Sequence, residues 1–248
     1  MVFENKILKK AETTSKIFSF NDICKMFGLE IIKSNIPTID ETIKSNSKEI
    51  IEHFTQCSDI LLFLQSAASR SYYEVKYSLH PPYTTSNLDC EYILKKLINT
   101  GLIDDYYYSL ISKSYRIMLN TTSKYNINTL LCIGLSSLLE EATATDIVFN
   151  SCFRSSDGKF IYADIACRFN DRILLISFEI ATGLERDVAS HSEQLKRLTD
   201  KILQSYTIES NNIRKYFVVT SHCKELLPSH KCVVSVSDLI KFLNNFKA

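Results

Sequence analysis

Hydrophobic positions follow a helical spacing through most of the first half of the chain and a mixture of helical and strand-like spacings in the second half. In the second half, the leucines within residues 128–141 recur at the interval of an amphipathic helix, and residues 186–206 predict a long second helix. Ser237 is a suitable N-cap for a last helix. The predicted strands are residues 146–153, 161–169, 172–180, 215–221 and 232–236. The resulting order, α-β-β-β-α-β-β-α, predicts an α/β domain over residues 126–248.

Residues 1–125 predict an α-rich domain. Asn21 as N-cap and Gly28 as C-cap bound a short helix in this part of the chain. Residues 34–47 contain few apolar positions and predict a loop that leads into residues 47–54. The strongly apolar run 59–68 predicts a buried helix.

A helix over residues 87–99 is predicted from its apolar stripe, with Ser86 or Asn87 as N-cap and Gly101 after its end. Extended segments are predicted at residues 109–111 and 114–120.

The run Lys95-Lys-Leu-Ile-Asn-Thr-Gly-Leu-Ile103, with a helix before it and a hairpin after it, resembles the end of the recognition helix in winged-helix proteins. The resemblance covers about residues 80–120. It implies DNA contacts from the helix and the wing. The DNA-binding candidates are Lys95, Lys96, Lys113 and Arg116. Many winged helices serve only as protein contacts, so that alternative stays open.

Composition and charge are those of an ordinary globular protein, with 45% hydrophobic and 23% charged residues and a formal net charge of +1. Nucleic-acid binders often carry a basic excess, which is absent here, although a local basic face is not excluded. The eight cysteines include no CxxC pair. No apolar run approaches the roughly 20 residues of a membrane helix, and no secretion signal is visible. We therefore expect a cytoplasmic protein with reduced thiols and no membrane partner.

The polar pair Asn170-Asp171 separates two apolar-rich runs and predicts a tight hairpin turn. If Phe169 faces Arg172 across the turn, Asp164 lies opposite Ser177. Tyr162 then lies opposite Glu179, so the two carboxylates share one face as diagonal neighbours, with Cβ atoms about 7–8 Å apart or less. Two carboxylates at that separation predict a site for one hard cation such as Mg²⁺.

The order of elements and this acidic pair resemble the PD-(D/E)XK (restriction-endonuclease-like) nuclease superfamily over about 120 residues. Asp164 follows the pattern of an aspartate between apolar strand residues, and Glu179-Ile-Ala-Thr-Gly183 parallels the family's Glu-x-Lys-(Thr)-Gly. The resemblance implies that Asp164 and Glu179 hold magnesium, with Glu141 (or its neighbour Glu140) as a third acidic group. It also implies hydrolysis of a phosphodiester by a metal-activated water.

The motif lysine is replaced by Ala181, which cannot position a water or offset charge. Three explanations stay open. The basic function has moved to the long helix, with Arg186 or Lys196 as candidates and Gln194 as a further member of the site. Or the domain binds metal or DNA without cutting. Or the fold differs, and the two carboxylates are solvated strand residues.

The sequence therefore predicts a protein that binds or processes DNA, with a nuclease-like domain that is inactive or has a rearranged site. One alternative is a magnesium-dependent deoxyribonuclease with a displaced basic residue. Another is an assembly protein that uses both modules for contacts with a protein partner or with a second copy of itself.

Overall fold

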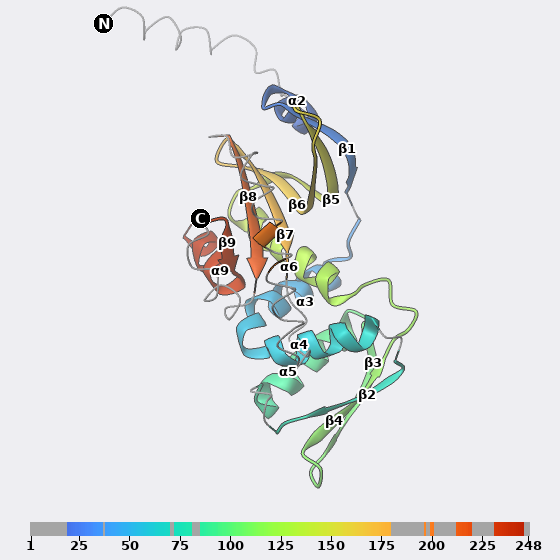
Figure 1. The fold of residues 1–248 in the computed structure, drawn as a ribbon. Coiled ribbons are helices and arrows are strands. Elements are labelled where there is room, and N and C mark those ends of the chain that lie inside the picture. Colours follow the sequence, from blue (N-terminus) through green and yellow to red (C-terminus); the bar gives the residue numbers. More distant parts are fainter. Residues whose placement is uncertain are drawn as a thin grey trace, which may run out of the picture.

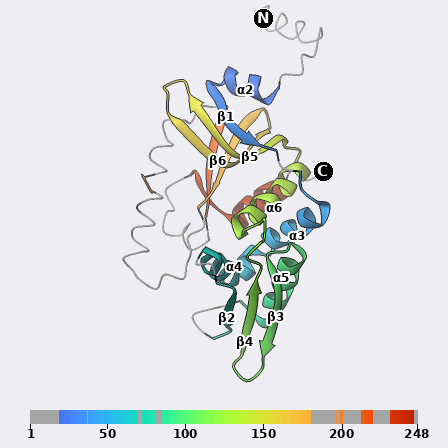
Figure 2. The same cartoon turned by 90° about the vertical axis from the view of Figure 1, so that its right-hand side faces the viewer.

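Two β-sheets lie at opposite ends of the molecule, with a layer of helices between them (Figure 1). The structure is a computed structural model. It describes residues 19–36, 38–69, 72–80, 85–179, 196, 199–200, 212–219 and 231–245. Figure 2 shows the same arrangement from the side, with α6, α3, α4 and α5 between the sheets. Among the described residues, no helix is long and apolar enough to cross a membrane.

The larger sheet has six strands in the order β1-β5-β6-β7-β8-β9. Neighbours from β1 to β7 are antiparallel, whereas the pairs β7–β8 and β8–β9 are parallel. The strands are β1 (Leu29–Asn35), β5 (Thr145–Ser155), β6 (Phe160–Phe169), β7 (Arg172–Phe178), β8 (Ile213–Val219) and β9 (Val233–Ser235). Helices α6 (Ile127–Glu141) and α9 (Val236–Asn244) complete this part. The predicted order of elements is confirmed where it is described, but the predicted helix 186–206 is described only at residues 196, 199 and 200, all helical.

The tight turn between β6 and β7 is confirmed. Asn170 and Asp171 have φ angles of 47° and 58°, the left-handed conformation that both residues of a type I′ turn require. Phe169 pairs with Arg172 as predicted, and the register continues without a shift to Ile165 opposite Ile176.

The start of the described chain differs from the prediction in three places. Helix α2 (Phe20–Met26) is capped by Ser19 and not by Asn21, because the Ser19 side chain and Asp22 form a reciprocal capping box. The run after Gly28 forms β1, which pairs with β5 and so extends the sheet of the second half. Helix α3 (Glu41–Glu52) replaces the second half of the loop predicted at 34–47. The predicted boundary at residue 125 stays a prediction.

The smaller sheet has the order β2-β4-β3 and is antiparallel throughout. Its strands are β2 (Glu74–Ser78), β3 (Ile103–Ser109) and β4 (Ser114–Leu119), and helices α4 (Phe54–Ser69) and α5 (Asn87–Asn99) pack beside it. The predicted helix 87–99 is confirmed, with Ser86 as N-cap. Gly101 follows with φ 69°, as expected after a helix end. At the other end of the chain, Ser235 rather than Ser237 caps α9.

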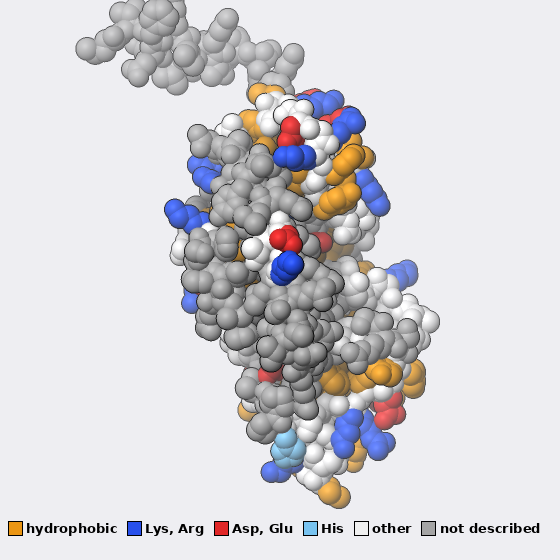
Figure 3. Space-filling model, in the orientation of Figure 1, with side chains coloured by type: hydrophobic (Ala, Val, Ile, Leu, Met, Phe, Trp, Pro, Cys, Tyr) orange, Lys and Arg blue, Asp and Glu red, His pale blue; other side chains and the backbone are white. Residues whose placement is uncertain are grey.

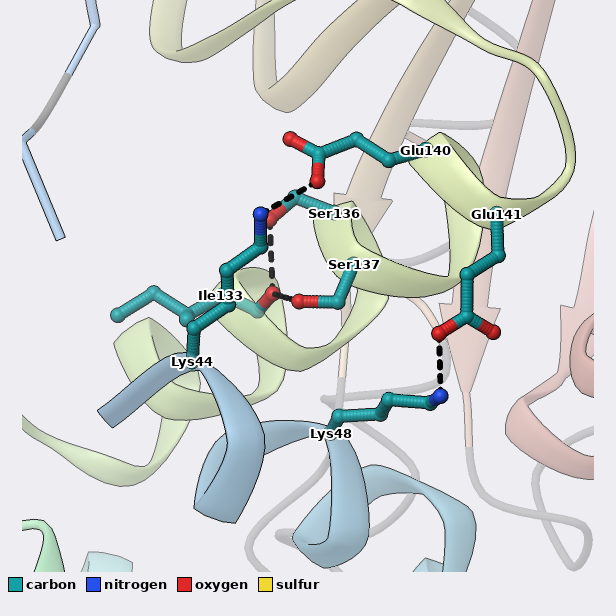
Figure 4. Close-up of polar contacts among 7 residues, drawn as sticks. All are labelled: Lys44, Lys48, Ile133, Ser136, Ser137, Glu140 and Glu141. Atoms are coloured by element: carbon teal, nitrogen blue, oxygen red, sulfur yellow. Dashed lines mark hydrogen bonds and ion pairs between the residues drawn. The ribbon is translucent and has the colours of Figure 1, made fainter. Parts of the chain in front are cut away.

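Helices α3 and α6 join the two halves by an unusually close contact. Gly134 of α6 lies against the backbone of Ser47, and a Cβ added at residue 134 would be 2.2 Å from the Ser47 carbonyl oxygen. Figure 4 shows the ion pairs beside this contact, Lys44 with Glu140 and Lys48 with Glu141.

In the same region, the hydroxyls of Ser136 and Ser137 donate to the Ile133 carbonyl, 2.7 and 3.2 Å away (Figure 4). These two buried hydroxyls are therefore satisfied inside the helix. One apolar core runs through the whole contact, from Ile117 in the smaller sheet to Val218 in the larger one.

Gly134→Ala is expected to lower the free energy of unfolding by about 1–3 kcal/mol, because the added methyl group overpacks the α3–α6 contact. The sign of the change is informative, since alanine at an open helix position is more favourable than glycine by about 1 kcal/mol. Urea unfolding followed by circular dichroism measures the difference. Equal or higher stability in the variant would contradict the close contact.

Candidate functional site

The two predicted acidic residues lie where β6 and β7 separate. The β6–β7 register ends at Ile165 opposite Ile176, and its continuation would place Asp164 beside Ser177. The Ser177 hydroxyl donates to the Tyr162 carbonyl at 3.3 Å, so the strands stay adjacent through side-chain contacts. Asp164 and Glu179 are both half-buried. The register ends before these two residues, so their placement on one face stays a prediction.

Each acidic residue is fixed by a backbone contact. One Asp164 carboxylate oxygen accepts the Phe178 N–H at 2.7 Å, which supplies the partner that the diverging β6 backbone no longer offers. The Glu179 N–H donates to the Val218 carbonyl at 2.9 Å and so ties the residue to β8. Asp164 therefore has a structural role in addition to any chemical one.

Strand β5 is irregular opposite Asp164. The pairs Phe149–Ile165 and Ser151–Ala163 flank this position, and Asn150 between them has a left-handed φ of 47°. Asparagine tolerates this conformation better than most residues, and β5 continues through it to Ser155. Backbone irregularities of this kind are common beside functional sites.

A basic residue that the sequence analysis missed reaches the same place. Lys215 of β8 extends over β7, and its Nζ donates to the Tyr162 carbonyl at 3.0 Å. The same amine lies 5.0 Å from the centre of the Phe217 ring. The Tyr162 carbonyl, two residues before Asp164, thus accepts from both Lys215 and Ser177. A positive charge therefore lies at the separation of β6 and β7.

In the sequence, Lys215 marks the start of a predicted strand, and nothing in the local pattern links it to Asp164. Parallel pairing of β7 with β8 sets Lys215 beside Leu175.

Of the other predicted members of the site, the structure describes Glu141 and Lys196. Glu141 forms an ion pair with Lys48. Within the described ranges, no group of three His, Cys, Asp or Glu side chains is placed to hold a metal ion. Lys196 is helical and exposed. Ala181, Arg186 and Gln194 lie outside the described residues.

The Cys132 thiol, whose pKa responds to the charge of Asp164, stays protonated. Cys132 of α6 is buried, and this burial is the larger cause of its raised pKa. The negative charge of Asp164 raises the pKa further. A thiol must lose its proton to bind a metal ion. Cys132 is therefore a poor metal ligand, and the oxygen donors of Asp164 and Glu179 define the chemistry.

The four predicted DNA-binding residues have different surroundings. Lys96 forms an ion pair with Glu49 at 2.5 Å and lies over the Tyr92 ring. The hydrogen bond from Lys96 is the main cause that holds the pKa of Glu49 below its usual range, and the hydrogen bond from Tyr92 is the second. This cluster links α5 to α3. The remaining three, Lys95, Lys113 and Arg116, are exposed.

The outer face of the smaller sheet carries a basic and aromatic row. Arg116 in the central strand pairs with Lys76 on one side and Tyr107 on the other. All three residues are exposed, and Tyr107 is 65% exposed. Glu74 lies 3.9 Å from Arg116, so the row is not purely basic. Figure 3 shows Lys and Arg side chains gathered at this end of the molecule, over the strands of the smaller sheet.

No protein-family model matches the sequence, and no curated protein matches it. The fold is that of a mixed α/β protein with similar solved structures. One is Can2 from Sulfobacillus thermosulfidooxidans in complex with cyclic tetra-adenylate, with 12% identity, a TM-score of 0.52, and coverage of 94% of this chain and 61% of that one. Another is VC1899 from Vibrio cholerae, with 14% identity, a TM-score of 0.52, and coverage of 93% and 62%. The chain spans less than two-thirds of either protein, and the likeness concerns the fold.

Asp164→Ala is expected to lower the free energy of unfolding by about 1–3 kcal/mol, because the Phe178 N–H loses its acceptor. Asp164→Asn keeps an amide oxygen for that N–H, so its free energy of unfolding is expected to fall distinctly less. Urea unfolding of the two variants measures the contrast. Equal losses would show that the hydrogen bond does not stabilise the separated strands.

Proposed function

We propose that this protein binds nucleic acid and hydrolyses its phosphodiester bonds at a rearranged nuclease-like site on the six-stranded sheet. The observation that carries the proposal is the position of Lys215, whose amine lies at the Tyr162 carbonyl, two residues before Asp164. It supplies from β8 the positive charge that Ala181 cannot supply.

The two carboxylates fit a magnesium ion. Mg²⁺ is commonly bound by one or two protein carboxylates, with waters and substrate phosphates completing its shell. Asp164 and Glu179 supply carboxylate oxygens, and the neutral Cys132 thiol does not compete. When bound, the ion would polarise the phosphodiester and lower the pKa of a water.

The protein's own residues have distinct roles in this proposal. The Phe178 N–H orients the Asp164 carboxylate before any ligand arrives. The Lys215 ammonium, held by the Tyr162 carbonyl, faces the negative charge that develops on the phosphate oxygens. A preorganised charge of this kind typically contributes a factor of about 10²–10³ in rate.

The smaller sheet is proposed to hold the nucleic acid. Its outer row offers two cations for phosphates, Lys76 and Arg116, and one ring for stacking, Tyr107. Stacking of a base on an aromatic ring typically contributes about 1–3 kcal/mol. The strand order β2-β4-β3 with α5 before β3 supports the winged-helix resemblance.

The fold comparisons support this direction only broadly. Can2 was solved with cyclic tetra-adenylate, a ligand made of linked nucleotides. A phosphodiester ligand on a protein of similar fold agrees with a nucleic-acid or nucleotide substrate for this chain.

Cleavage tests the site directly. Linear, branched and single-stranded DNA are incubated with the purified protein and magnesium or manganese. Lys215→Met is expected to lower the cleavage rate by about 100-fold, because it removes the charge and keeps an apolar stem. Asp164→Asn and Glu179→Gln are expected to abolish cleavage, whereas Lys215→Arg restores part of it.

Lys241→Met is the matched control, since Lys241 is an exposed lysine on α9. Its rate is expected to equal that of the unmodified protein. Binding without cleavage by the unmodified protein would contradict the hydrolytic role and leave a nuclease-like binding domain. If the unmodified protein neither binds nor cleaves DNA and forms a stable oligomer, the assembly alternative is favoured.

The binding role predicts a salt effect. For duplex DNA, the logarithm of affinity falls with the logarithm of salt concentration by about 0.9 for each phosphate contact. Lys76→Ala and Arg116→Ala are each expected to reduce this slope by about 1. Lys25→Ala, an exposed lysine of α2, is the control and is expected to leave it unchanged. Fluorescence anisotropy at several salt concentrations measures the slopes, and unchanged slopes in both variants would exclude this face.

A further inference from the structure

A cavity lies between α4 and the connection from β4 to α6. Its volume is about 440 Å³. Pockets for small ligands commonly measure about 300–1,000 Å³, so this one is large enough for a compound ligand rather than a water. None of the predicted site residues that the structure describes lines it.

The described wall of the cavity combines apolar, aromatic and uncharged polar residues. Among the described residues that line it, none is Asp, Glu, Lys, Arg or His. Leu64, Leu102 and Leu119 contribute buried apolar surface. Tyr72, which is 50% exposed, and Tyr125 contribute rings. An uncharged wall of this kind disfavours a free anion or cation, because it offers no opposite charge to offset desolvation.

Three asparagines give the cavity an excess of hydrogen-bond donors. The Asn120 side-chain oxygen accepts from Thr122, and that of Asn126 accepts from Thr129. The Asn128 oxygen accepts from Gln65 Nε2 at 3.1 Å. In the described part of the chain, the amide NH₂ groups of the three asparagines have no recorded acceptor.

Gln65 adds an acceptor to this set. While its Nε2 donates to Asn128, its Oε1 is buried and has no hydrogen-bond partner among the described residues. A buried polar atom without a partner typically costs about 1–3 kcal/mol, so a ligand donor that reached it would recover that loss.

We propose that this cavity binds a nucleobase, either of a free nucleoside or nucleotide or of a base turned out from a strand. A base is planar and suits the tyrosine rings. Its edge carries both acceptors, for the asparagine amides, and donors, for Gln65. It is also uncharged, as the wall requires. The proposal is independent of hydrolysis at the six-stranded sheet.

Calorimetry with adenosine, guanosine, cytidine and uridine tests the free-base source, and titration with short single-stranded oligonucleotides tests the strand source. At least one probe is expected to bind the unmodified protein. Gln65→Leu is expected to weaken that binding about tenfold, the effect of losing one buried hydrogen bond. Gln56→Leu makes the same change at an exposed position of the same helix, outside the cavity, and is expected to have no effect.

Tyr72→Ala keeps the test decisive if Gln65→Leu does not fold, because Tyr72 is half exposed and its truncation spares the core. It is expected to weaken the same probe. If the cavity variants bind a nucleoside more weakly, the ligand is a free base. If they bind only oligonucleotides more weakly, the ligand is a base in a strand. The proposal is overturned if no probe binds, if the cavity variants bind as the unmodified protein does, or if inorganic phosphate displaces the bound probe.

Discussion

Helix α6 crosses α3 with backbone against backbone, because Gly134 has no side chain and the Ser47 carbonyl occupies the space that a Cβ would need. The crossing brings the helices of the smaller sheet against the helix of the larger one, and one apolar core cluster reaches both sheets. Two lysines of α3 and two glutamates of α6 pair beside it. Exposed ion pairs contribute about 0–1 kcal/mol each, so close packing, which depends on one glycine, dominates the contact.

The same helix α6 lies next to both candidate sites. Its first residues, from Asn126 to Asn128, line the uncharged cavity. Further along, Cys132 lies close enough to Asp164 for the carboxylate charge to raise the thiol pKa. The α3–α6 contact therefore fixes the position of the acidic face relative to the cavity and to the basic row on the smaller sheet. Both proposed nucleic-acid contacts and the proposed hydrolytic site belong to one packed body.

Most elements were predictable from local pattern, and the misses have a common cause. The leucine spacing of α6, the capped helix α5 and the turn at Asn170-Asp171 are local signals, and the structure contains all three. Helix α3 was missed because it buries Asn46 and Ser47, small polar residues that fit a close helix crossing and do not mark an apolar stripe. Strand β1 was missed because it is an edge strand with only Leu29 buried.

For the site, the sequence by itself determined the turn between β6 and β7 and the register from Phe169 opposite Arg172 to Ile165 opposite Ile176, which stops short of Asp164 and Glu179. Only the tertiary structure decided which groups join them. Glu141, predicted as a ligand, pairs with Lys48 of α3, and Lys215 reaches the Tyr162 carbonyl from β8. A hairpin register follows from neighbouring residues, whereas these contacts depend on helix packing and on parallel strand pairing between segments far apart in the chain.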